Sequence, residues 1–233
     1  MSSSPSIVIT GGFGALGSAI GTAAADAGAR VCLIGHGDAP DTPLPCIGNI
    51  DLTDPEKAQA ALQQAARLLG GIDALVNVAG GFQWQTLAGD AFDAWDRMYA
   101  MNLKTAVLAT RAALPWLRAR PQARIVNVGA TAALSAAAGM GAYAASKAGV
   151  IKLTEALSAE LADAGINVNA VLPSIIDTPQ NRRDMPDADP RQWVRAEDVA
   201  RVVLFFLGPG AVAVTGAALP VTLGRGARSD AHL

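Results

Sequence analysis

Short apolar segments alternate with longer segments in which apolar residues recur every three or four positions. The short segments are typical of buried strands, and the longer pattern is typical of amphipathic helices. Regular alternation of strands and helices indicates a parallel sheet with helices on both of its faces. The pattern therefore predicts an α/β protein, a single doubly wound domain with a parallel sheet of about seven strands.

The predicted strands are Ile7–Thr10, Arg30–Ile34, Ile47–Ile50, Ile72–Val78, Arg124–Val128, Ile166–Leu172 and Ala217–Val221. The predicted helices are Gly14–Ala27, Pro55 to about Leu69, Ala91–Met101, Leu103–Arg118, Tyr143–Ala162 and Glu197–Leu207. Asp54 before Pro55 is a typical N-cap, and Gly28 closes the first helix. No repeat or linker divides the chain, so we expect one domain over residues 1–233.

The composition indicates which classes of binding partner the protein can have. The 233 residues are 51% hydrophobic and only 16% charged, which favours burial of surface by partner subunits. A net charge of −2 without a basic cluster argues against nucleic acid as a partner. No apolar run is long and pure enough to span a bilayer, and the first residues lack a signal-peptide pattern. Two cysteines, Cys32 and Cys46, give neither a disulfide framework nor metal spacing. We expect a soluble, cytoplasmic protein without a metal site.

The segment Tyr143-Ala-Ala-Ser-Lys147 carries candidate chemistry. A spacing of four residues places the phenol and the ammonium on one face of a helix. A phenol titrates near ~10, and a neighbouring ammonium lowers that pKa toward the range of an acid–base catalyst. The same spacing also arises by chance in any lysine-containing helix.

A glycine-rich turn follows the first predicted strand and precedes the first predicted helix. Its glycines are Gly11, Gly12, Gly14 and Gly17. Such a turn lets backbone N–H groups approach a pyrophosphate at the helix N-terminus, where the helix dipole favours negative charge. The alternative is a turn that binds no ligand.

Five motifs in this order, from Ile7 to about Leu223, resemble the short-chain dehydrogenase/reductase family. The resemblance implies a Rossmann domain, with a cofactor half at about residues 1–125 and a catalytic half at about 126–223. It implies an NAD(P)-dependent enzyme acting on a small carbonyl, hydroxyl or imine-like substrate, and a homotetramer. A non-catalytic NAD(P)-binding sensor or scaffold is the alternative from another class.

The resemblance also implies residue roles. Tyr143 donates a proton to the substrate, Lys147 lowers the pKa of the tyrosine and bonds the nicotinamide ribose, and Asn102 kinks its helix and holds a water. Asn102 is otherwise a polar residue at a helix junction. Cofactor contacts are implied for Gly11, Phe13, Gly14, Leu16, Gly17, Gly35, His36, Asp51, Leu52, Asn77, Ala79, Gly80, Tyr143, Lys147, Pro173, Ile176 and Thr178. Asp51, Asn77 and Thr178 each have an alternative reading as turn or cap residues.

The end of the second strand bears on the choice of coenzyme. Family members that prefer NAD usually have an aspartate there, where this chain has Gly35. His36 follows at a position where an arginine often binds the 2′-phosphate. NADP(H) is therefore favoured and NAD(H) remains possible, because Asp38 or Asp41 could fold back toward the ribose. His36 is otherwise an exposed loop residue.

The family's catalytic serine has no counterpart, because Ala130 stands thirteen positions before Tyr143. Its absence implies an easily reduced substrate, a substitute donor such as Thr131 or Ser135, or lost catalysis. Quinonoid dihydropteridine reductase shares the gap, and residues 12–18, 79–81, 129–143 and 172–193 resemble it in part. Gly35 and Asn102 both depart from that enzyme.

The segment from Pro173 to Trp193 is the expected substrate lid, and Phe82, Gln83 and Trp84 are candidates for the same pocket. A hydrolase is disfavoured, because no G-x-S-x-G motif occurs and the two histidines are His36 and His232. Metal catalysis is disfavoured for lack of ligand clusters.

Overall fold

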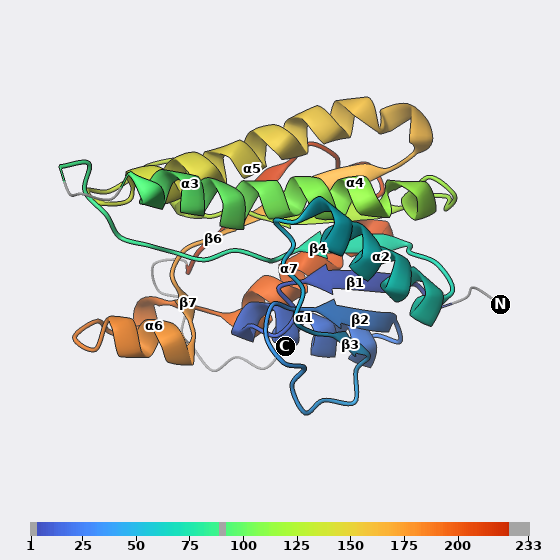
Figure 1. Ribbon diagram of the computed structural model, residues 1–233, viewed down its shortest axis with the longest axis horizontal. Coiled ribbons are helices and arrows are strands. Elements are labelled where there is room, and N and C mark those ends of the chain that lie inside the picture. The colour runs from blue at the N-terminus through green and yellow to red at the C-terminus, as the bar shows by residue number, and fades with distance from the viewer. Residues whose placement is uncertain (1–3, 89–91, 224–233) are drawn as a thin grey trace.

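The computed structural model describes residues 4–88 and 92–223. Seven strands form one parallel sheet in the order β3-β2-β1-β4-β5-β6-β9, as Figure 1 shows in part. The predicted doubly wound sheet is thereby confirmed. The strands are β1 (Ser6–Thr10), β2 (Arg30–Ile34), β3 (Cys46–Ile47), β4 (Ala74–Asn77), β5 (Arg124–Val128), β6 (Asn167–Pro173) and β9 (Ala218–Val221).

Helices cover both faces of the sheet (Figure 1). One face carries α1 (Ala15–Asp26) and α7 (Ala196–Leu207), and the other carries α2 (Pro55–Leu69), α4 (Thr105–Leu117) and α5 (Gly141–Glu160). Successive strand residues point to opposite faces, so Val8 joins one apolar core while Ile7 and Ile9 join the other. None of the helices in the described part of the chain is long and apolar enough to cross a membrane.

Two elements differ from the prediction. The predicted strand Ile47–Ile50 ends at Ile47, because Asn49 adopts a left-handed φ of 58° that interrupts extended backbone. The predicted pair of helices is one continuous helical run, in which α3 (Asp93–Tyr99) passes through a π-helical turn at Ala100–Lys104 into α4. The predicted start at Ala91 lies outside the described residues, as does His232.

The predicted lid contains secondary structure of its own. A parallel pair of two-residue strands, β7 (Ile176–Asp177) within it and β8 (Val194–Arg195) directly after it, ties the start of this segment to the residues that follow its end. Between them lie α6 (Pro179–Asp184) and a 3₁₀ turn at Pro190–Gln192. Figure 1 shows α6 projecting away from the main sheet.

Candidate active site

A cleft of about 1040 Å³ lies at the carboxyl ends of the central strands. This edge of an open parallel sheet is where α/β proteins bind their ligands. Its walls come from the glycine turn, the end of β2, the segment after β4, the start of α5 and the lid. Of the predicted residues, it is lined by Gly11, Phe13, Gly14, Leu16, Gly17, Gly35, His36, Gly80, Tyr143, Lys147, Pro173, Ile176 and Thr178.

The glycine turn and the start of α1 form one wall. Gly11 has a φ of +64°, and a Cβ there would lie 2.6 Å from the backbone nitrogen of Ala79. A Cβ on Gly17 would lie 2.3 Å from the carbonyl oxygen of Gly11, so this close turn requires glycine at both positions. The first turn of α1 has no side-chain cap and no acidic residue. Its N-terminus therefore presents backbone donors and positive dipole to an anion.

A side pocket of about 390 Å³ shares Gly11, Gly35, His36 and Gly80 with the cleft. The predicted Asp51, Leu52 and Ala79 line it. Thr53 donates two bonds to Asp51 Oδ1, from its hydroxyl at 2.7 Å and its backbone N–H at 2.9 Å, and these bonds lower the pKa of Asp51.

The same side pocket contains residues that sequence reasoning missed, namely Arg97, Met101 and Thr105. They recur every four positions along α3, the π-helical turn and α4, which is the period of one helix face. That period is the sequence signal that could have identified them.

Tyr143 and Lys147 lie together in the cleft, but their electrostatics differ from the prediction. Burial raises the pKa of Tyr143 to about 12, so the expected lowering by Lys147 is wrong for this structure. Burial lowers the pKa of Lys147 to about 8, and its Nζ donates to the carbonyl oxygen of Val128 at 2.9 Å. Desolvation disfavours the charged form of each group, and it is the cause of both shifts. At neutral pH the pair is a neutral phenol beside an ammonium.

Asn102 sits in the π-helical turn and is buried behind the cleft. Its Oδ1 accepts from the backbone N–H of Gly81 at 2.9 Å, and its Nδ2 donates to Ser146 Oγ at 3.0 Å. Ser146 in turn donates to the carbonyl oxygen of Tyr143 at 2.7 Å. The side chain of Asn102 therefore joins the segment after β4 to the first turns of α5, which carry Tyr143 and Lys147.

Asn77 does not line the cleft or the side pocket. Its Nδ2 donates to Thr110 Oγ1 at 3.0 Å and to Asn127 Oδ1 at 2.9 Å. Asn127 continues the chain of bonds to Thr154 Oγ1 at 2.9 Å. In this structure the Asn77 side chain ties β4 and β5 to the helices packed on them.

The position of the missing serine lies within the site. Ala130 is buried and lines the cleft, whereas Thr131 is absent from its lining. The Thr131 hydroxyl lies 3.5 Å from the carbonyl oxygen of Pro173, its donor contact among the described residues. Thr131 therefore does not supply the missing hydroxyl in this conformation.

The candidate pocket residues after β4 differ in whether they reach the cleft. Phe82 lines the cleft, and its ring meets that of Tyr143 edge to face at a centroid distance of 5.0 Å. Trp84 instead donates from Nε1 to the carbonyl oxygen of Ala138 at 3.1 Å, and neither it nor Gln83 lines the cleft.

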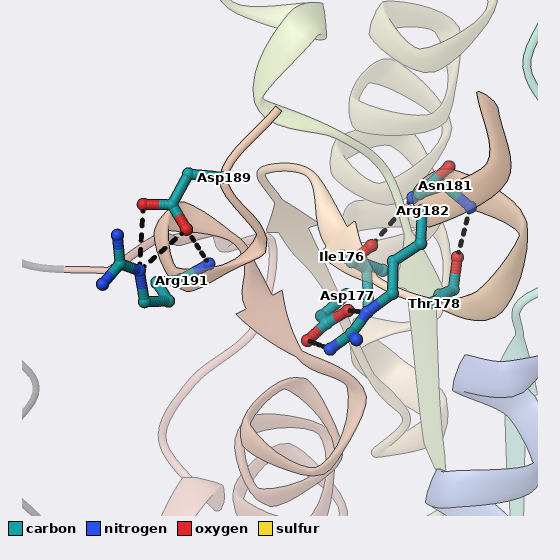
Figure 2. Close-up of polar contacts among 7 residues, drawn as sticks. All are labelled: Ile176, Asp177, Thr178, Asn181, Arg182, Asp189 and Arg191. Atoms are coloured by element: carbon teal, nitrogen blue, oxygen red, sulfur yellow. Dashed lines mark hydrogen bonds and ion pairs between the residues drawn. The ribbon is translucent and has the colours of Figure 1, made fainter. Parts of the chain in front are cut away.

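The predicted lid segment carries its own polar framework, drawn in Figure 2. Arg182 binds both oxygens of Asp177, at 2.6 and 2.8 Å. Thr178 accepts from the backbone N–H of Asn181 at 3.1 Å as the N-cap of α6, while Asn181 Nδ2 donates to the carbonyl oxygen of Ile176 at 2.8 Å. Asp189 and Arg191 form a second ion pair at 2.9 Å. These bonds are local to the lid and give it a defined shape.

The model of the short chain dehydrogenase family matches residues 5–189, which include the glycine turn, Asn102, Tyr143 and Lys147. The chain belongs to this family. It is 32% identical to 2-(S)-hydroxypropyl-CoM dehydrogenase 3 of Xanthobacter autotrophicus, over 92% of this chain and 94% of that protein. It is 28% identical to D-beta-hydroxybutyrate dehydrogenase of Rhizobium meliloti, over 90% and 93% of the two chains.

The structure of aldohexose dehydrogenase from Thermoplasma acidophilum superimposes with a TM-score of 0.88 at 26% identity, covering 99% of this chain and 97% of that one. Because the relatives of this family are dehydrogenases and reductases, the protein is an oxidoreductase of this class. Short-chain dehydrogenases bind NAD(P)(H). Within residues 4–88 and 92–223, no three histidine, cysteine or acidic residues cluster as metal ligands would.

Proposed function

We propose that this oxidoreductase reduces a small carbonyl or imine-like group, or oxidises the corresponding alcohol or amine, with Tyr143 as the acid–base residue. The observation that supports it best is the common cleft, where a phenol and an ammonium meet an uncapped helix N-terminus and a glycine turn. The chain's donor set suits a dinucleotide, because α1 offers a site for its pyrophosphate and Lys147 a cation for its ribose hydroxyls. When bound, the nicotinamide supplies or accepts the hydride.

Tyr143 is suited to give a proton. Its raised pKa, about 12, keeps the phenol protonated at neutral pH, ready to protonate an oxygen or nitrogen as negative charge develops there. Lys147 stabilises that charge by its proximity and holds the ribose. Asn102 is a positioning residue, because its bonds to Gly81 and Ser146 hold the cleft wall and the start of α5 in place.

We favour NADP(H) over NAD(H). The end of β2 carries Gly35 and the exposed His36 in the cleft lining, without a carboxylate. Asp38, which was expected to be able to fold back, instead accepts from Asn49 Nδ2 at 3.0 Å. Neither Asp38 nor Asp41 lines the cleft or the side pocket. A 2′-phosphate at the end of β2 would therefore meet the imidazole of His36 and no acid from β2 itself, while the carboxylate that shares the adjoining side pocket with His36 is that of Asp51.

The proposed function is tested by following NADPH and NADH absorbance with a panel of ketones, activated diketones and freshly generated quinonoid dihydropterin, after subtraction of uncatalysed reduction. Turnover of the dihydropterin above that of all ketones would identify a pterin reductase. Coenzyme binding without turnover of any member would contradict the proposed activity.

Ala130→Ser tests the vacant serine position. Because Ala130 is buried in the cleft wall, we expect a hydroxyl there to donate to the substrate oxygen and to raise kcat/KM for an unactivated ketone by roughly 5- to 30-fold. Initial rates at saturating coenzyme measure it. Ala133→Ser, in the adjoining turn outside the cleft lining, is the matched control and should stay within about twofold. A loss of activity in Ala130→Ser would mean that the substrate itself fills this space.

We also propose that the protein assembles as a homotetramer. The β9 strand is an edge of the sheet as described, with Leu219 exposed, and Val107 on α4 is exposed as well. Unpaired edges and exposed apolar side chains favour pairing with another copy. Sedimentation velocity should give a mass near four chains at low micromolar concentration. A stable monomer there would refute the assembly.

A further inference from the structure

The end of β2 contains an unusually close approach between Gly35 and Phe13. A Cβ on Gly35 would lie 2.1 Å from Phe13 Cδ2 and 2.4 Å from Cγ, far inside any real carbon contact. The backbone of Gly35 is held on both sides, since its N–H donates to Ile47 at 3.1 Å and its carbonyl accepts from Ile50 at 3.0 Å. The strand therefore cannot shift to make room, and the ring would have to move.

Phe13 is also held in place. It belongs to the glycine turn, is half-buried and packs against the apolar core beneath α1. The preceding Gly12 donates to the carbonyl oxygen of Ile34 at 3.0 Å, which pins the turn to the end of β2. Both Phe13 and Gly35 line the cleft.

We propose that Phe13 is a coenzyme-selectivity residue whose ring occupies the space of any side chain at position 35 and so keeps the end of β2 free of a carboxylate. Resting on the proposed function, this assigns the ribose end of the cleft to a coenzyme that carries a 2′-phosphate. The wall at this point is an aromatic ring with the exposed His36 beside it, in place of the acid that would bind two ribose hydroxyls. Positions 13 and 35 are then energetically coupled. A carboxylate at position 35 binds the ribose of NADH only when the ring at position 13 is also replaced.

The packing is tested first, on the protein without coenzyme. Gly35→Ala should lower the thermal midpoint by roughly 3–10 °C, because a methyl group is forced into a filled space. In the Phe13→Ala background the same substitution should lower it by less than about 2 °C. Gly37→Ala is the matched control, because a Cβ at Gly37 would have no heavy atom of the described residues within 4 Å. Equal losses from Gly35→Ala in both backgrounds would overturn the steric claim.

Selectivity is tested by titrating NADPH and NADH and following tryptophan fluorescence. Gly35→Asp alone should weaken both coenzymes at least about tenfold, because the displaced ring disturbs the turn that faces the pyrophosphate. Phe13→Ala with Gly35→Asp should bind NADH at least about tenfold more tightly than Gly35→Asp does, and should bind NADPH more weakly than wild type, since the carboxylate repels a 2′-phosphate.

Two results would overturn the proposal. One is a Gly35→Asp variant that binds NADH as tightly as the double variant. The other is a wild-type protein that binds NADH more tightly than NADPH. If the wild type bound neither coenzyme, the proposed function would fail, and the selectivity role of Phe13 would fail with it. The thermal midpoints would still test the packing of Phe13 against Gly35.

Discussion

Replacing Tyr143 by phenylalanine should lower kcat about 10³-fold while the dissociation constant of the coenzyme changes by less than about threefold. The substitution removes one hydroxyl and keeps the ring, which still meets Phe82 edge to face. Proton donation to the substrate is lost, but the glycine turn and the N-terminus of α1 are untouched. Single-turnover absorbance at the nicotinamide band and a fluorescence titration measure the two quantities separately.

The chain offers a matched control for this variant. Its other tyrosine, Tyr99, is exposed at the end of α3 and lines neither cavity. Tyr99→Phe should leave kcat within about twofold. Wild-type turnover in Tyr143→Phe would remove the phenol from the mechanism.

The direction of reaction should respond to pH through the same phenol. Because burial raises the pKa of Tyr143 to about 12, the neutral donor form predominates up to pH 10, and the phenolate needed to accept a proton becomes more populated with each rise in pH. Alcohol oxidation should therefore rise with pH more steeply than carbonyl reduction does. The Tyr143→Phe variant should show no such difference.

Replacing Lys147 by methionine should lower activity and yet stabilise the protein by about 2 kcal/mol at pH 7. The ammonium is buried with a single protein hydrogen bond among the described residues, to Val128. An apolar chain of similar length removes the cost of that buried charge, although it leaves the Val128 carbonyl without this donor. Activity should fall at least about 100-fold, because the charge beside Tyr143 and the ribose is lost.

The pH dependence of stability supplies a sharper test of the same residue. Burial lowers the folded-state pKa of Lys147 from 10.5 to about 8, so the unfolded chain holds this proton more tightly. The destabilisation is fully present below pH 8 and is relieved as pH rises toward 10.5, by at most about 3 kcal/mol. Tyr143 has the opposite effect on folding stability, but only above pH 10. Because its folded-state pKa is raised to about 12, the stability that it contributes is lost between pH 10 and about pH 12.

Urea unfolding at pH 7 and at pH 9.5 measures this window below the tyrosine's range. Wild-type stability should gain from Lys147 over that interval, and Lys147→Met should lack this part of the gain. Lys152→Met is the control, since Lys152 is exposed on the same helix and pairs with Glu155 at 2.8 Å; it should change stability by less than about 0.5 kcal/mol. A Lys147→Met variant less stable than wild type at pH 7 would contradict the prediction.

Local pattern was enough to specify most of the fold, while the family resemblance supplied most of the residues expected in the cleft. Periodicity alone predicts strand β5 and places Tyr143 and Lys147 on one face of a helix. The N-cap Asp54 accepts from the backbone N–H groups of Glu56 and Lys57, as its sequence predicts. Parallel strands bring their carboxyl ends to one edge, and Gly11, Gly35 and Gly80, which follow β1, β2 and β4, line the cleft there.

Tertiary structure alone decided what depends on long-range packing. The bonds of Asn102 to Gly81 and Ser146, the bonds that turn Asn77 inward and the ring of Phe13 over Gly35 each join segments distant in sequence, which no local pattern encodes. The pKa values of Tyr143 and Lys147 diverge for the same reason, because desolvation depends on everything packed around a group, while sequence spacing shows only the neighbour on one helix face.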